Sequence, residues 1–247
     1  MKVFIDWSYK IGPMAGHKWV RSESVSECDL VVVVNSNRQY TNKQCVNWLY
    51  EPESILPTIY RNKSVSRIAT HITDTYGSNI VIPPCFPSWI DKGDRRIYNK
   101  SKLVSMIASC KNICNGHTFR QVVADRNSKT LDLYGFGRER ELKTKVDGLR
   151  DYMFSVAMEN GKYDLYYTEK ILDCFLTGTI PIYWGSPKIT NIFDTHGIIT
   201  LNDDGSLPII SKEIYLSKME SVRNNFEIAK KMNYTSSDGI QFIVDKI

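Results

Sequence analysis

The segment 154–187 constrains the fold of this chain more than any other. It reads FSVAMENGKYDLYYTEKILDCFLTGTIPIYWGSP. An apolar strand is predicted at 154–158 and a second, buried strand at 180–184. Between them lie a polar loop and an apolar helix that starts near Thr168 and ends near Gly178. A strand–loop–helix–strand unit with polar and charged groups at the loop and at the helix start is where an α/β fold binds a phosphorylated ligand.

Short apolar runs separated by polar segments recur along the rest of the chain. They predict strands at 2–5, 29–35, 46–50, 68–72, 79–82, 103–109, 131–135 and 197–201, and helices at 117–125, 142–152 and 214–232. Strands that alternate with helices predict parallel sheets. The proline-rich run 83–87 can continue neither a ladder nor a helix and separates two such sets.

The sequence therefore predicts two Rossmann-like domains, with the boundary between residues 83 and 102. We assign residues 1–95 to the first domain and 96–247 to the second, whose final helix can pack back on the first.

Composition excludes several classes of protein. The chain has 247 residues, of which 42% are hydrophobic and 24% charged, with a net charge of +5. Lysines and arginines are scattered, so a nucleic-acid surface is not expected. No apolar run is long enough for a transmembrane helix, and the first residues do not form a signal peptide. We therefore expect a cytoplasmic protein of a microbial or viral host cell, with peripheral membrane contact left open. The alternative is a chain that has been trimmed of its anchor. The sequence does not indicate the oligomeric state.

The sequence gives little reason to expect a metal. Cys110, Cys114 and His117 have a Cys-x3-Cys-x2-His spacing without a second ligand pair, which is a weak zinc signal. Asp203 and Asp204 lie in a polar turn rather than at the end of a predicted strand. No metal and no other cofactor are predicted.

Four residues offer the chemistry that an anionic ligand needs. Thr168 can cap the helix whose first turn carries Glu169 and Lys170, so a diphosphate there would meet free N–H groups and an ammonium. Arg120 lies on the helix that follows the first strand of the second domain, and its guanidinium can bind two phosphate oxygens.

The order Glu159-Asn160, loop, Tyr-x-Thr-Glu-Lys, apolar helix and Ile-Pro-Ile-Tyr-Trp-Gly-Ser-Pro resembles the nucleotide-sugar motif of the α-1,3/4-fucosyltransferases, glycosyltransferase family 10. Upstream, Ser105 to Arg120 and the Asp132-Leu133-Tyr134-Gly135 turn are similar to the same family. The resemblance covers about residues 100 to 200 and is only an outline in the first domain.

This resemblance implies a GT-B fold, in which the parallel sheets of two Rossmann-like domains face a central cleft. It implies an inverting, metal-independent transfer of L-fucose from GDP-fucose to a hydroxyl of a glycan. By position, Arg120 and Lys170 would hold the diphosphate, and Asn160, Tyr166 and Glu169 would contact the ribose or the sugar. The expected donor site also includes Glu159, Thr168, Tyr134 and Gly135.

The family's general base is a carboxylate on a loop of the first domain, and Glu51 is the best match. Tyr50 stands where the family has a small residue, which leaves Glu53 as the alternative base or as an acceptor contact. His17 and Trp19, in the loop after the first strand, are further candidates for acceptor binding, although a buried Trp is commoner. Two other interpretations remain open: another GDP-sugar donor, or a protein that binds a nucleotide sugar without catalysis.

Overall fold

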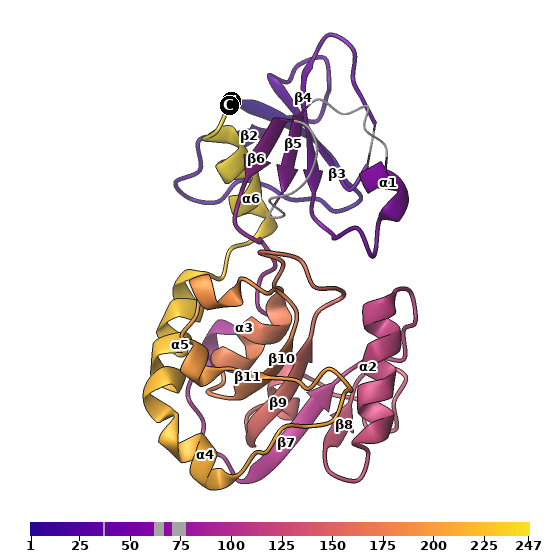
Figure 1. Ribbon diagram of the computed structural model, residues 1–247. Coiled ribbons are helices and arrows are strands. Elements are labelled where there is room, and N and C mark those ends of the chain that lie inside the picture. Colours follow the sequence, from indigo (N-terminus) through magenta and orange to yellow (C-terminus); the bar gives the residue numbers. More distant parts are fainter. Residues whose placement is uncertain (37, 62–66, 71–77) are drawn as a thin grey trace. The chain divides into compact units, whose positions relative to one another are not determined.

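The computed structural model describes residues 1–36, 38–61, 67–70 and 78–247. They divide into two compact units, each built around its own parallel sheet (Figure 1). The first unit contains Met1–Pro87, Tyr163–Tyr166 and Tyr234–Ile247, and the second contains Ser88–Lys162 and Tyr167–Asn233.

The first unit is a six-stranded parallel sheet in the order β2-β1-β3-β4-β5-β6. Its strands are β1 (Lys2–Asp6), β2 (Val20–Arg21), β3 (Leu30–Val34), β4 (Gln44–Leu49), β5 (Arg67–Thr70) and β6 (Ser78–Val81), and its helices are α1 (Pro57–Arg61) and α6 (Ser236–Val244). All five residues of β3 are buried, as the continuous apolar run predicts for a strand covered on both faces.

Helix α6 supplies part of the core of the first unit from the far end of the chain. Thr235 and Asp238 form a capping box that starts the helix. The side chains of Ile240 and Ile243 are fully buried in the same cluster as Trp48. The first unit is thus completed by residues that follow the whole of the second.

The second unit is a five-stranded parallel sheet in the order β11-β10-β9-β7-β8. Its strands are β7 (Lys102–Ile107), β8 (Asp132–Tyr134), β9 (Tyr152–Met158), β10 (Ile180–Trp184) and β11 (Ile199–Thr200). Its helices are η1 (Lys92–Asp94), α2 (Asn115–Arg126), η2 (Lys145–Gly148), α3 (Glu169–Phe175), η3 (Ile189–Asn191), η4 (Thr195–Gly197), α4 (Lys212–Ser217) and α5 (Met219–Lys231).

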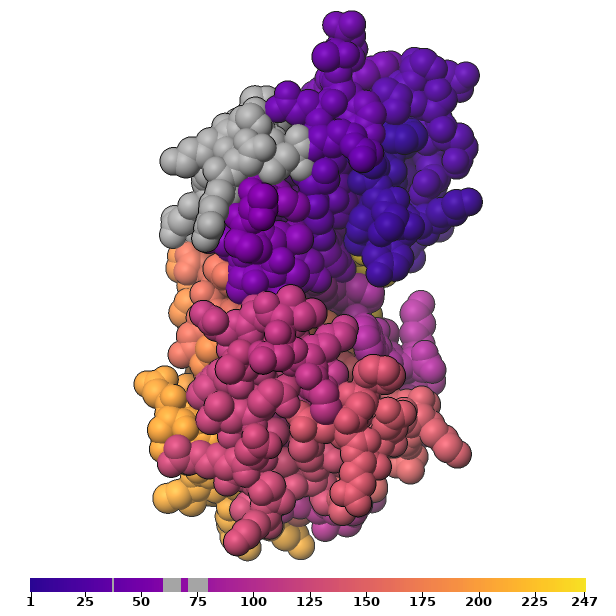
Figure 2. All heavy atoms as spheres, turned by 90° about the vertical axis from the view of Figure 1, so that its right-hand side faces the viewer, coloured from indigo at the N-terminus to yellow at the C-terminus, as the bar shows by residue number. Residues whose placement is uncertain are grey.

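The helices cover both faces of this second sheet. Figure 1 shows α2 on one side of the sheet and α3 on the other. Val123 and Ala124 of α2 pack with Val104 and Val156, whereas α3 packs against the opposite face. The space-filling view shows α2 on the outside of its unit (Figure 2). The strand order reverses between β7 and β9, which is the switch point of a doubly wound sheet.

The structure corrects the expected helices. Residues 142–152 do not form one helix: only the short η2 turn forms, and β9 begins at Tyr152. Residues 214–232 form two helices, α4 and α5, which meet at Lys218. The last helix of the chain is α6, which the apolar pattern did not predict. Of the strand predicted at 68–72, residues 71 and 72 lie outside the described residues.

Candidate functional site

The carboxyl ends of β7 and β9 are where a doubly wound sheet binds ligands, because the chain leaves these two strands toward opposite faces. Helix α2 follows β7, and its first turn lies directly against the loop after β9. A Cβ atom at Gly116 would collide with the backbone carbonyl of Asn160. Glycine at this position therefore allows the start of α2 to touch the end of β9.

Arg120 holds the same two segments together from one turn further along α2. Its side chain is buried, with 6% of the residue exposed. The Nη2 group donates to the carbonyl oxygen of Met158 at 2.9 Å and to Oδ1 of Asn160 at 3.2 Å. A guanidinium fixed in this way presents a cation at the end of β9 in a set orientation.

Glu159 and Thr168 close the loop that separates β9 from α3. Glu159 is fully buried, and its carboxylate accepts from the backbone N–H of Thr168 at 3.0 Å and from its hydroxyl at 2.7 Å. Burial raises the pKa of Glu159. Thr168 also caps α3 by accepting from the backbone N–H of Lys170.

Lys170 lies between two carboxylates. Its Nζ is 3.5 Å from Oε2 of Glu159 and 3.3 Å from Oε1 of Glu169. Burial disfavours the ammonium, but the two carboxylates outweigh that cost and raise the pKa of Lys170. Burial likewise opposes the Glu169 carboxylate, and the ammonium groups of Lys170 and Lys145 overcome it, lowering the pKa of Glu169 to about 2.

Six residues thus meet at one place, and all were predicted from the sequence. We call them the switch-point residues: Arg120, Glu159, Asn160, Thr168, Glu169 and Lys170. They combine two fixed cations, an amide and a buried carboxylate beside the first turn of α2, where Cys114 makes no side-chain cap and the helix dipole favours an anion. Such a set can hold a diphosphate and stabilise charge that develops on it.

His117 and Cys114 border this set at the start of α2. The Sγ atom of Cys114 is 3.2 Å from Nδ1 of His117, and His117 is 6% exposed. Burial, together with the neighbouring Arg120 and Lys170, lowers the pKa of His117 to about 4, so the imidazole is neutral at pH 7. Within the described residues, no group of three or more His, Cys, Asp or Glu side chains could hold a metal ion.

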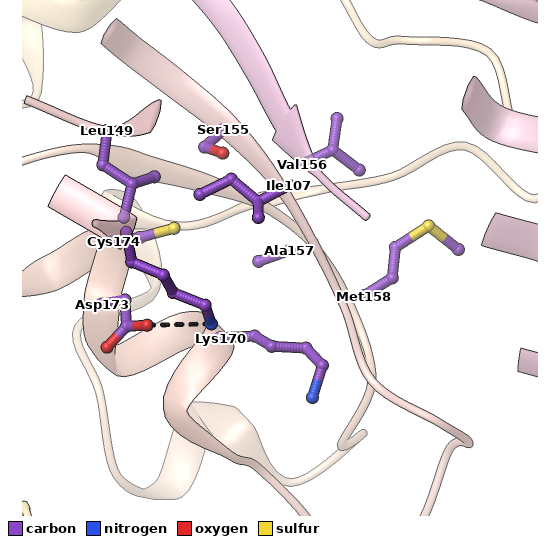
Figure 3. A pocket seen from close by; sticks show the side chains of 10 residues that line it. Ile107, Leu149, Ser155, Val156, Ala157, Met158, Lys170, Asp173 and Cys174 are labelled. Carbon is purple, nitrogen blue, oxygen red and sulfur yellow. Dashed lines mark ion pairs between the residues drawn. The ribbon is translucent and has the colours of Figure 1, made fainter. Parts of the chain in front are cut away.

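Lys145 and Asp173 were not predicted from the sequence. Both line a small cavity of about 20 Å³ beneath the switch-point residues, together with Lys170 and Cys174, which is room for roughly one water molecule (Figure 3). Asp173 is 1% exposed, and the dashed line from its labelled carboxylate marks the ion pair with Lys145, whose side chain is drawn there without a label. Neither residue lies in a recognisable motif. The one signal in the sequence is that Asp173 is an acid on the apolar face of the predicted helix.

Tyr134 and Gly135 lie in a different arrangement. The Tyr134 hydroxyl is 2.7 Å from that of Tyr152, which donates to Asp132 at 2.8 Å, so it belongs to a network with other partners. Gly135 has φ of +143° and packs against the carbonyl of Ala108. Their predicted role in donor binding remains a prediction.

Glu51 and Glu53 follow β4 in the first unit and differ in their surroundings. The backbone N–H of Glu51 donates to Oδ1 of Asn35 at 3.0 Å, and Oε2 of Glu51 accepts from the Tyr166 hydroxyl at 3.5 Å. Glu51 is half-buried, whereas Glu53 is exposed. The structure therefore joins two of the predicted residues, Glu51 and Tyr166, within the first unit.

The two residues of the first loop that are predicted to contact the acceptor differ in their surroundings. Trp19 is 1% exposed in the core of the first unit, because the fold uses its ring to fill that core. Nε2 of His17 is 3.1 Å from Oδ1 of Asp238, and Nδ1 accepts from the backbone N–H of Met14 at 3.0 Å. These contacts connect the loop to the start of α6, and the acceptor-binding role of His17 and Trp19 remains a prediction.

Comparison with known proteins identifies one family model and several related proteins. The family model described as "Glycosyltransferase family 10 (fucosyltransferase) C-term" matches residues 97–227. The alpha-(1,3)-fucosyltransferase FucT of Helicobacter pylori is 39% identical over 62 residues, which are 25% of this chain and 13% of that protein. A fucosyltransferase-like protein of Arabidopsis thaliana is 28% identical over 130 residues, 51% of this chain and 22% of that protein. The matched stretches span less than a quarter of either relative.

Solved structures resemble a larger part of the chain. A crystal structure of an alpha1,3-fucosyltransferase with GDP matches with a TM-score of 0.54 at 17% identity, covering 94% of this chain and 81% of that one. A structure of an alpha1,3-fucosyltransferase with GDP-fucose matches with a TM-score of 0.52, also at 17% identity and with the same coverage. These likenesses confirm the predicted α/β fold of the GT-B kind, with two Rossmann-like parallel sheets. Along the described part of the chain, no helix has the length and apolar character needed to span a bilayer.

Proposed function

The chain belongs to glycosyltransferase family 10, and we propose that it transfers L-fucose from GDP-fucose to a hydroxyl of a glycan acceptor. The observation that carries this proposal is the set of switch-point residues, which lies within the matched region 97–227. They bring the buried Arg120 and the half-buried Lys170 to the end of β9, where a doubly wound sheet binds phosphorylated ligands.

The proposed donor site is the second unit. Arg120 and Lys170 hold the diphosphate, and Asn160 and Glu169 contact the ribose or the sugar. The two cations stabilise the charge that GDP gains as it leaves, and they need no reorganisation because their positions are already fixed by protein contacts. In this proposal they do what a divalent ion does in other glycosyltransferases, and no metal takes part.

The proposed acceptor site is the first unit, with Glu51 as general base. Inverting transfer needs one carboxylate that takes the proton of the acceptor hydroxyl as this oxygen attacks C1 of the sugar. The carbon passes through an oxocarbenium-like state, the bond to GDP breaks, and the configuration inverts. The support for Glu51 over Glu53 is that its backbone is held by Asn35 and its carboxylate by Tyr166.

A transfer assay with GDP-fucose and a panel of glycans tests this proposal. Removing a general base typically slows a reaction by about 10²–10⁴-fold, so Glu51→Gln is expected to lose transfer by that factor while GDP-fucose affinity stays nearly unchanged. Glu53→Gln is the matched control and should stay active. Excess EDTA should leave turnover intact.

Each other outcome points to a different conclusion. A dead Glu53→Gln with an active Glu51→Gln moves the base by two residues. Turnover with another GDP-sugar but not with GDP-fucose changes the donor. Donor binding without transfer or hydrolysis would make the chain a nucleotide-sugar-binding protein, and complete loss of activity in EDTA would show that a metal is needed.

A further inference from the structure

Lys145 is a charged residue outside every motif in the sequence, yet it reaches the switch-point residues. It begins the η2 turn, and its side chain is only 17% exposed. Its Nζ lies 3.1 Å from Oδ2 of Asp173 and 3.6 Å from Oε1 of Glu169. Taking an ammonium and two carboxylates out of water costs free energy, which the attraction between them only partly repays. Such an arrangement therefore calls for a functional explanation.

The surroundings of Lys145 fix it in place. Its Nζ lies 4.4 Å from the centroid of the Trp89 ring, within the range of a cation–π contact. Asp173 cannot follow a moving lysine, because its Oδ1 accepts from the Ser88 hydroxyl at 2.6 Å and from the backbone N–H of Trp89 at 2.9 Å. Contacts with residues 88–89 and with α3 therefore hold Lys145 beside Glu169.

Glu169 forms ion pairs with two ammonium groups, and we expect only one of them to bind the ligand. Both Lys145 and Lys170 lie within ion-pair distance of Oε1 of Glu169, at 3.6 and 3.3 Å. Lys170 is also shared with Glu159. If Lys170 binds a diphosphate, part of its charge is withdrawn from Glu169, which is then left close to a ligand of its own sign. A cation that does not bind the ligand, such as Lys145, can hold the carboxylate in place at that moment.

We propose that Lys145 is a positioning residue that holds the Glu169 carboxylate in the orientation needed to contact the donor. This inference rests on the proposed function, since it concerns the same donor site. Glu has three side-chain torsions, and ordering them in the free protein lowers the entropy cost of binding. Lys145 acts through Glu169 and is not expected to touch the substrate itself.

The first test compares Lys145→Met with Lys143→Met. Lys143 is exposed and two residues away, so the control removes the same charge from the same segment. Misplacing a positioned group commonly costs about 10²-fold, and we expect kcat/KM for GDP-fucose to fall about ten- to hundred-fold in Lys145→Met only. Lys145→Arg keeps the charge and should recover part of the loss. Equal kinetics in Lys145→Met and the wild-type chain would overturn the proposal.

Two double variants separate positioning from stability. In Lys145→Met/Asp173→Asn, no buried acid is left without its cation, so the thermal midpoint should return toward the wild-type value while kcat/KM stays low. In a Glu169→Gln background, Lys145→Met should change kcat/KM less than two-fold, because the residue it acts on has gone. Full recovery of activity in the first double variant, or a full additive loss in the second, contradicts a positioning role.

A measurement that needs no turnover distinguishes this inference from the proposed function. The carboxyl carbon of Glu169 can be titrated by NMR in the wild-type chain and in Lys145→Met, with Glu169→Gln identifying the signal. Glu159, Asp173 and Lys170 face the same carboxylate and are unchanged in both. The pKa should rise from about 2 toward the ordinary glutamate value. An unchanged pKa overturns the inference even in an active enzyme, whereas a shifted pKa in a chain that binds no GDP-sugar would mean that the proposed function alone has failed.

Discussion

His117 lies beside the charged switch-point residues, and burial and the neighbouring positive charges lower its pKa. It is buried against Cys114 and lies in the field of Arg120 and Lys170. Its folded pKa of about 4 is below the value of about 6.5 expected in an unfolded chain. Between about pH 4 and 6.5, His117 is protonated in the unfolded chain and neutral in the folded chain. Lowering the pH through this range therefore destabilises the fold.

The buried, neutral His117 should make stability depend on pH, and His117→Asn should remove that dependence. The contribution of His117 is fully present above pH 6.5 and is lost as the pH falls to about 4, by up to about 3 kcal/mol. Urea unfolding between pH 4 and 7 measures it. The free energy of unfolding of the wild-type chain should fall faster than that of His117→Asn over this range. Parallel curves for the two proteins would show that His117 is not held neutral.

At the scale of elements, the site depends on how closely α2 approaches the end of β9. Gly116 and Arg120 lie one turn apart on this helix and touch the backbone of residues 158–160. Any side chain at Gly116 would push the helix away, and Arg120 would move with it. The cation that we place on the diphosphate is thus set by a backbone-to-backbone contact.

Gly116→Ala is therefore expected to weaken both stability and donor binding. Inserting a methyl group into a closely packed contact costs about 1–3 kcal/mol. Thermal unfolding and GDP calorimetry should both show a loss. Gly93→Ala is the matched control, because a Cβ atom there meets nothing within 4 Å, and it should leave both measurements unchanged. Wild-type GDP affinity in Gly116→Ala would separate the helix position from binding.

At the scale of the whole molecule, the two units draw on the sequence differently. The second unit is nearly continuous and contains the family match apart from Tyr163–Tyr166, whereas the first is completed by the C-terminal α6. Ile240 and Ile243 are fully buried beside Trp48, and Gly239 is packed against that Trp48 ring. Removing these two side chains opens the core of the first unit.

A chain ending at Asn233 should consequently lose the first unit while keeping the second. Each buried Ile contributes about 2–5 kcal/mol against truncation to Ala, so losing the whole helix costs an amount comparable to the usual stability of a domain, about 5–15 kcal/mol. Hydrogen exchange should show unprotected amides in β1, β3 and β4 and protected ones in β7, β9 and β10. GDP binding should survive, and fucosyl transfer should be lost. Loss of protection in both sheets would mean that the units do not fold independently.

The sequence predicts those features that local patterns determine. The parallel sheets follow from alternating strands and helices, and Thr168, Glu169, Lys170 and Arg120 follow from the cap, the helix start and the motif. What it does not predict depends on contacts between distant residues. Lys145 and Asp173 are 28 positions apart and look like ordinary surface and helix residues until the fold brings them together. A tryptophan such as Trp19 can be exposed or buried, depending on the residues packed around it, and here its ring is buried in the core of the first unit.

Titration calorimetry with GDP tests the central claim most directly, because the claim is that the switch-point residues bind the donor nucleotide. The wild-type chain should bind one GDP. A charge-assisted hydrogen bond contributes about 1.5–3 kcal/mol, so Arg120→Ala and Lys170→Ala should each weaken binding about ten- to hundred-fold. Lys143→Met should bind like the wild-type chain. A wild-type chain that binds no GDP, or unchanged affinity in both Arg120→Ala and Lys170→Ala, would contradict the account.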